Sequence, residues 1–220
     1  MADSQNYLAM VLDAPLQSWG HMSRFDRRMS LSYPTCSGII GLLCAAMGVD
    51  RFDTEGLAAF KYLKISVFPF QQGSRMIDYH TVGGGYDNKF KKQNIVPKAN
   101  GSPGDPVQTY REYLEDYRFG IILQDTSERL TEIGEALQNP RWGIWLGRKA
   151  CVPARPVFHG VHCSLEEALV HMADCLNISR PGSCIFEVPK FSDGNDTIND
   201  VPLDFSKREF APRRVKIEPY

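Results

Sequence analysis

The chain has 220 residues, of which 43% are hydrophobic and 23% charged, and its formal net charge is −1. This length suits one large domain with its own core, and the composition excludes collagen-like, wholly disordered and coiled-coil chains. It contains no apolar run of about 18 residues and no basic, apolar leader, so we expect neither a membrane-spanning helix nor a secretory signal, and we expect a cytoplasmic location.

The near-neutral total hides an uneven distribution of charge. Basic residues gather at 24–28, 89–98, 141–155 and 207–216, and acidic residues at 112–135 and 187–204. A phosphate backbone responds to local charge, because the Debye length is only about 8 Å at physiological salt. Each basic run can also be an ordinary solvated face. Glycine and aromatic residues accompany the bases at 83–92 and 142–149, which suits close approach to a nucleic acid and stacking on unpaired bases.

The first elements are a strand and a helix. The apolar run 7–12 has the length of a strand, and an irregular, turn-rich segment follows at 13–35. A helix is predicted from Ser37, as its cap, to a stop at Gly48. Its apolar face follows helical spacing at Ile39, Leu42, Leu43, Ala46 and Met47.

A second strand precedes a long insertion. Residues 63–68 alternate between apolar and polar side chains, as expected of a strand. From 71 to 117 this regular pattern stops, and 86–106 contains little that could form a core. A structureless loop of this length is uncommon unless it has a function.

Another strand, helix and strand complete the first domain. The strand is predicted at 118–123, and Asp125 and Glu128 offer a cap for the helix that follows. The buried face of this helix is predicted at Leu130, Ile133 and Leu137. With a last strand at 156–161, the order becomes β-α-β-β-α-β, which predicts an α+β, ferredoxin-like domain over 1–162.

The remaining residues, 163–220, are expected to form a small C-terminal α/β extension packed on that domain. Ser164 and Glu167 form a capping box that opens a helix. Strands are predicted at 184–188 and 213–217, with an acidic loop between them.

Two motifs in the first domain allow two interpretations each. Trp19, just after the first strand, is either a buried anchor of the turn or part of a stacking and hydrogen-bonding surface. Gly38 either lets the free N–H groups of a helix N-terminus meet a phosphate or lets the helix pack closely. For Gly41 we favour close packing.

Neither a metal nor a cofactor is expected. The six cysteines contain no Cys-x-x-Cys pair, so they are interpreted as reduced structural thiols. His159 and His162 lie near Cys163, but a further pair of ligands is missing from that stretch.

Five stretches resemble a known family, in the same order along the chain. They are APLQSWG (14–20), YPTCSGIIGLLCAAMG (33–48), DYHTV (78–82), QTYREYL (108–114) and PRWGIWLGRKACVPARPVFHG (140–160). The chain is similar to the CasD-type subunits of the Cascade complex, which are RAMP proteins of type I CRISPR systems, and we expect subtype I-E.

This resemblance implies a non-catalytic subunit of a CRISPR RNA-guided surveillance complex in antiviral defence. Such a subunit binds the 5′ handle of the CRISPR RNA and caps one end of the subunit backbone. The implied partners are this RNA, the backbone subunit, the large subunit and, through the assembled complex, target DNA, but no membrane. The insertion 71–117 would be a thumb hairpin with DYHTV and QTYREYL as its stems.

The resemblance and the basic runs together predict a set of RNA-contacting residues. Gly147, Arg148 and Lys149 would form a phosphate-binding turn, and the lysines near 90 would lie against RNA or a neighbouring subunit. The full set is Gln17, Trp19, Arg24, Arg27, Thr35, Ser37, Gly38, Tyr79, His80, Thr81, Lys89, Lys91, Lys92, Gln108, Arg111, Gly147, Arg148 and Lys149.

Two alternatives remain open. His80 beside Tyr79 could act as an acid/base pair in a metal-independent endoribonuclease that cuts the CRISPR repeat RNA. A purely structural subunit would assemble with its partners without leaving a footprint on RNA.

Overall fold

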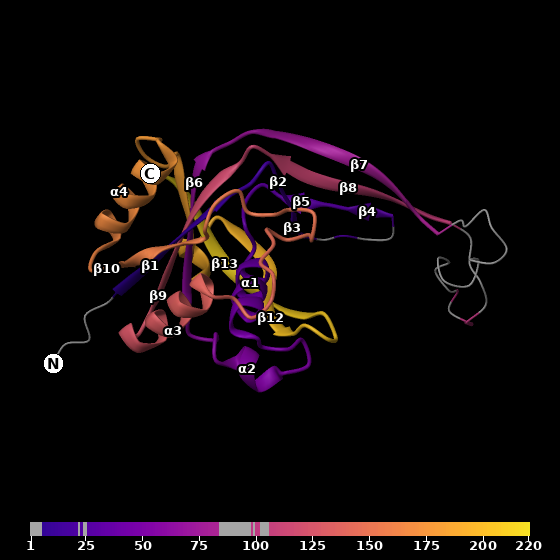
Figure 1. The fold of residues 1–220 in the computed structure, drawn as a ribbon, viewed down its shortest axis with the longest axis horizontal. Coiled ribbons are helices and arrows are strands. Elements are labelled where there is room, and N and C mark those ends of the chain that lie inside the picture. Colours follow the sequence, from indigo (N-terminus) through magenta and orange to yellow (C-terminus); the bar gives the residue numbers. More distant parts are fainter. Residues whose placement is uncertain (1–5, 22, 24–25, 84–97, 99, 102–105) are drawn as a thin grey trace.

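The computed structural model describes residues 6–220 except 22, 24–25, 84–97, 99 and 102–105 (Figure 1). Within these residues, seven strands form one sheet in the order β10-β1-β9-β6-β11-β13-β12, and every neighbouring pair in it is antiparallel. The strands are β1 (Asn6–Asp13), β6 (Lys64–Gln71), β9 (Arg118–Asp125), β10 (Phe158–His162), β11 (Ser183–Glu187), β12 (Asp196–Asp204) and β13 (Glu209–Pro219).

Helices cover both faces of this sheet. They are α1 (Cys36–Met47), α2 (Thr54–Ala58), α3 (Ser127–Gln138) and α4 (Leu165–Leu176), with a short 3-10 turn at Phe191–Asp193. Leu8, Met10 and Leu12 of β1 pack toward α1 and α3, whereas Ala9 and Val11 pack toward α4. This alternation follows from the two-residue period of a strand. No helix in the described part of the chain is long and apolar enough to cross a membrane.

The first half of the sheet combines two crossover connections. The chain passes from β1 through α1 to β6, turns back after the insertion into β9, and passes through α3 to β10. β1 and β6 both run antiparallel to β9, so they are parallel to each other. β1 and β9 pair without interruption from Asn6 opposite Asp125 to Asp13 opposite Arg118.

The insertion contains a long hairpin. β7 (Ser74–Val82) and β8 (Val107–Glu115) pair in unbroken register over their whole length. Figure 1 shows this hairpin running away from the seven-stranded sheet. Its base is anchored by Tyr113 and Leu114, which are buried. Short strands from the segment before α1 join it, because β2 (Leu16–Gln17) and β4 (Arg27–Arg28) both pair with β8.

Several sequence-based expectations for local structure were wrong. The segment 13–35 is not simply irregular, since it contains β2 and β4 and also the pair β3 (Trp19–Gly20) and β5 (Ser30–Leu31). The acidic segment expected to be a loop contains β12, whose backbone is paired with β13. The short helix α2 was not predicted.

Two helix caps also differ by a residue or two from the prediction. Thr35, not Ser37, caps α1: it is extended, and its Oγ1 accepts from the Gly38 N–H at 3.1 Å. Thr126, not Asp125, caps α3 by accepting from the Arg129 N–H. The Ser164 cap of α4 is confirmed, because its hydroxyl accepts from the Glu167 N–H. The Glu167 carboxylate accepts from the Cys163 N–H, one residue before the position expected for a capping box.

A buried ion pair joins the C-terminal strands to α1. The Asp200 carboxylate on β12 accepts two hydrogen bonds from the Arg213 guanidinium on β13, at 2.7 and 3.0 Å. It also accepts from the Cys36 N–H at the start of α1, at 2.7 Å. The side chains of Asp200 and Arg213 are only 3% and 4% exposed. A carboxylate at a helix N-terminus is further stabilised by the helix dipole.

We expect Asp200→Asn to lower the free energy of unfolding by about 3–5 kcal/mol, because it leaves the buried Arg213 charge without its partner. Urea unfolding of the purified protein measures this change. Glu218→Gln is the matched control, since it neutralises one member of the half-exposed pair Lys216–Glu218. That control should cost less than about 1 kcal/mol. Equal losses in the two variants would contradict a special role for the buried pair.

Candidate functional site

A pocket of about 250 Å³ opens where four segments of the chain meet. It lies between the β2–β3 segment, the N-terminus of α1, the turn at 145–151 and the connection from β12 to β13. Its lining residues are Ser18, Trp19, Gly20, Thr35, Ser37, Gly38, Gly147, Arg148, Phe205 and Phe210. Six of these belong to the predicted RNA-contacting set, so the fold brings part of that set together from three separate motifs.

The N-terminus of α1 offers less to a phosphate than its sequence suggests. The Gly38 N–H donates to Thr35 and the Cys36 N–H donates to Asp200. Gly38 also lies against the Trp19 ring, where an added Cβ would be 2.8 Å from a ring carbon. Close packing therefore accounts for this glycine. What α1 presents to the pocket is mainly the half-buried Ser37.

Three residues of the predicted set are buried. Gln17, Trp19 and Thr35 are 0%, 1% and 2% exposed. The Gln17 amide donates to the carbonyls of Leu12 and Tyr117 and accepts from the Trp19 indole N–H. Their side chains thus build the floor of the site, and of the two interpretations of Trp19 the structure has the buried anchor.

The turn at 145–151 is held against this floor. Gly147 has φ +96°, and a Cβ there would lie 1.8 Å from the Ser18 carbonyl oxygen. The Arg148 guanidinium donates to the carbonyls of Glu112 and Arg28, both at 2.9 Å, and its Cζ lies 4.6 Å from the centroid of the Tyr113 ring. Arg148 therefore ties the turn to β4 and β8 while it lines the pocket.

Exposed cations and aromatic rings continue from the pocket onto the hairpin. Arg27 lies over the Tyr110 ring, which contacts the Tyr79 ring at a centroid distance of 5.4 Å. Arg28 is opposite Arg111 on the neighbouring strand β8, so two arginines stand side by side there. Lys149 is exposed beside the Trp145 ring. Among the described residues, the site thus offers positive charge together with faces for stacking.

The structure separates the two residues of the proposed acid/base pair. Tyr79 and His80 are consecutive in β7, so their side chains point to opposite faces of the hairpin. Tyr79 contacts Tyr110, whereas the His80 Nε2 contacts the Asp78 carboxylate. Thr81 and Gln108 are exposed and paired further along the hairpin. The described structure therefore does not bring these two side chains together, although they are adjacent in the sequence.

Other parts of the prediction fall outside the site. Arg24, Lys89, Lys91 and Lys92 lie outside the described residues. Burial raises the pKa of the Cys36 thiol, at the first position of α1, to about 12.

Sequence reasoning missed Phe205 and Phe210, whose rings contact each other at the pocket. They come from the C-terminal segment, where the family motifs end. Arg28 and Tyr110 were also missed, although each stands next to a residue that was predicted. The first of the two tyrosines within QTYREYL was the available signal for Tyr110.

Comparisons with known proteins give matches over nearly the whole chain. A family model described as CRISPR-associated protein (Cas_Cas5) matches residues 7–216. The CRISPR system Cascade subunit CasD of Escherichia coli (strain K12) is 29% identical over 224 residues, which cover 95% of this chain and 94% of that protein. A chain of a structure titled "CRISPR RNA-guided surveillance complex" is 31% identical with a TM-score of 0.78, over 97% of this chain and 89% of that one. A chain of a structure titled "Crystal structure of Cas protein" is 29% identical with a TM-score of 0.67, over 97% and 94%.

We expect Gly147→Ala to destabilise the protein and displace the turn that carries Arg148. The left-handed backbone alone costs about 1–3 kcal/mol for alanine, and the clash with Ser18 adds to this. Gly101→Ala is the control, because Gly101 also has a positive φ but an added Cβ meets nothing within 4 Å. Thermal unfolding should show a clearly larger loss for Gly147→Ala, and equal losses would contradict the close approach to Ser18.

Proposed function

The chain belongs to the CRISPR-associated Cas5 family, and on this premise we propose that it is a non-catalytic subunit of a CRISPR RNA-guided surveillance complex. Its proposed role is to bind the 5′ handle of the CRISPR RNA and to cap one end of the subunit backbone. The Escherichia coli relative is named a Cascade subunit, and one similar chain comes from a surveillance complex. Because the proposed ligand is an intracellular RNA, the proposal includes a cytoplasmic location.

The proposal includes a ferredoxin-like core over 1–162. The four strands of the β-α-β-β-α-β unit lie side by side in the sheet in the order β10-β1-β9-β6. When these strands are numbered by their order along the chain, the order in the sheet is 4-1-3-2. The segment 163–220 is proposed as an extension: α4 adds a layer, and β11, β13 and β12 continue the same sheet. The hairpin of β7 and β8 is proposed as the thumb of the family.

The pocket beside α1 is the observation that carries the RNA-binding role. It is lined by Ser37 and by an aromatic pair, and the exposed Lys149 stands on the turn that borders it. The exposed Arg28 stands on β4, where its carbonyl oxygen accepts from the pocket residue Arg148. An unpaired base can enter such a pocket and stack while cations contact the phosphates on either side. The RNA strand could continue from the pocket along the hairpin, over the neighbouring side chains of Arg27, Tyr110 and Tyr79.

The remaining partners follow from the same family role. Exposed apolar side chains on the hairpin, Ile77, Val82 and Val107, suit contact with a neighbouring backbone subunit. We propose that the large subunit is a second neighbour and that target DNA is reached only through the assembled complex.

We expect the double variant Arg28→Ala/Lys149→Ala to bind repeat-derived single-stranded RNA more weakly than the unmodified protein. Both side chains are exposed, and removing two phosphate contacts should reduce the slope of log K against log salt by about 1.4. Fluorescence anisotropy with labelled CRISPR repeat RNA at several salt concentrations measures both quantities.

The matched control is Lys64→Ala/Arg180→Ala, which removes two exposed cations from other elements. It should leave the affinity and the slope almost unchanged. If the Arg28/Lys149 variant also matches the unmodified protein, this surface does not hold the RNA. Assembly into the complex without any RNA footprint from this subunit would favour the purely structural alternative.

We also expect CRISPR repeat RNA to stay intact during incubation with the purified protein in EDTA. The separation of Tyr79 from His80 is the physical reason, since a general acid and base must both reach the cleaved phosphodiester. Denaturing gel electrophoresis of end-labelled RNA is the measurement. Site-specific cleavage that His80→Ala abolishes would establish the endoribonuclease alternative instead.

A further inference from the structure

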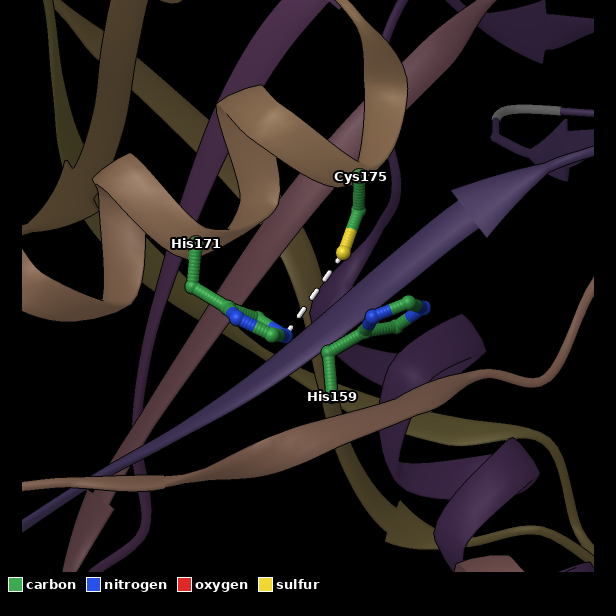
Figure 2. A group of neighbouring side chains, drawn as sticks. All are labelled: His159, His171 and Cys175. Atoms are coloured by element: carbon green, nitrogen blue, oxygen red, sulfur yellow. Dashed lines mark hydrogen bonds between the residues drawn. The ribbon is translucent and has the colours of Figure 1, made fainter.

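Three metal-ligating side chains meet between α4 and the edge strand β10, on elements that do not line the pocket described above. They are His159 of β10 and His171 and Cys175 of α4, and their ligand atoms all lie within 4.8 Å of one another (Figure 2). We propose that these three residues bind one zinc ion, which fastens β10 to α4. The proposal does not rest on the RNA-binding role.

The two residues on α4 already have the spacing of a metal chelate. His171 and Cys175 are four residues apart, so both project from one face of the helix. The distance between the His171 Nε2 and the Cys175 Sγ is 3.6 Å, the contact drawn in Figure 2. Tetrahedral zinc bonds of about 2.05 Å to nitrogen and 2.3 Å to sulfur place these two atoms about 3.6 Å apart.

His159 is oriented as a third ligand by a hydrogen bond on its other ring nitrogen. Its Nε2 lies 3.0 Å from the Pro156 carbonyl oxygen. Because a carbonyl can only accept, this contact assigns the proton to Nε2 and leaves the lone pair on Nδ1. Metal-binding histidines commonly donate their second N–H to a backbone carbonyl in this way, which fixes the ring for the metal.

An irregularity in β10 places its histidines on the side of α4. The pairing of β1 with β10 runs from Leu8 opposite Val161 to Met10 opposite Phe158, so β10 contains one extra residue there. Within this bulge Gly160 has φ +98°. Residues three apart in a regular strand face opposite sides, yet the rings of His159 and His162 both contact His171. Bulges often re-aim side chains near functional sites.

His162 is the nearest further candidate, but its nitrogens have other partners. Its Nε2 lies 3.1 Å from the His159 carbonyl oxygen, and its Nδ1 lies 3.6 Å from a Glu167 carboxylate oxygen. We therefore leave His162 outside the ligand set and assign the fourth position to water. Arg155 donates to the Cys175 carbonyl oxygen, and the Asp13 carboxylate, 2.8 Å from the Arg155 guanidinium, offsets its charge.

The donor set selects the kind of metal. Two imidazole nitrogens and one thiolate suit zinc, whereas magnesium and calcium require oxygen ligands. Binding removes the proton from the Cys175 thiol and leaves both histidines neutral, so the site carries one net positive charge. A single ion would then hold the outermost strand of the sheet, which pairs on one side only with β1, against the helix that covers it.

The test uses the full-length protein without an affinity tag, reduced and stripped of metal with a chelator. Titration with cobalt(II), a spectroscopic substitute for zinc, should give a thiolate-to-cobalt absorption band that saturates at one ion per chain. Zinc should displace the cobalt and raise the melting temperature, and a tenfold excess of magnesium should do neither.

Two variants and a control separate this site from incidental binding. Cys175→Ser should remove the thiolate band, and His171→Ala should weaken zinc binding by more than about 100-fold, since even outer-shell partners contribute 10–100-fold. Cys163→Ser, an exposed thiol outside the cluster, should bind as the unmodified protein does. Circular dichroism confirms that each variant is folded. The proposal is wrong if the folded protein shows no saturable band, if Cys175→Ser retains it, or if Cys163→Ser loses it.

Discussion

The architecture of the site depends on the hydrogen bonds and the ion pair of the buried Asp200 carboxylate. It satisfies a free N–H at the start of α1 and pairs with Arg213, so it joins the first crossover helix to the last two strands. A charge in this position must be fully paired, because its removal from water costs several kcal/mol. Phe205, on the connection from β12 to β13, and Phe210, at the start of β13, are thereby held near α1, and the C-terminal segment completes the pocket.

A second constraint is the dense packing beneath the pocket. Trp19 occupies the space left by the missing side chain of Gly38, and the Ser18 carbonyl occupies the space left by Gly147. The family motifs therefore include residues, such as Gly38 and Gly147, that allow separate segments of the chain to pack closely together. Among the described residues, the charge and aromatic faces available to a ligand come from exposed neighbours on β4, on the turn and on the hairpin, and from Phe205 and Phe210 at the pocket.

Strand β10 forms the edge of the sheet opposite to β12. An outermost strand has one unpaired side and relies on side-chain contacts to stay in place. Here β10 is bulged, and its histidines face a cysteine and a histidine of α4. Spacing along the chain pointed to His159, His162 and Cys163, and this group lacked enough ligands. The fold replaces two of these three with residues that lie on the next helix.

The order of the main strands and helices could be predicted from the sequence, because hydrophobic periodicity is a local property that the buried faces of β1, α3 and α4 preserve. The Ser164 cap and, through the motifs, the family could be predicted in the same way. The folded chain was needed to show that Thr35 caps α1, that the acidic segment forms β12, and that Gln17 and Trp19 are buried. These outcomes depend on partners such as Arg213 and Gly38, which are distant along the chain or across a turn. No local pattern shows which of two nearby polar side chains, such as Thr35 and Ser37, will find a hydrogen-bond partner in the folded chain.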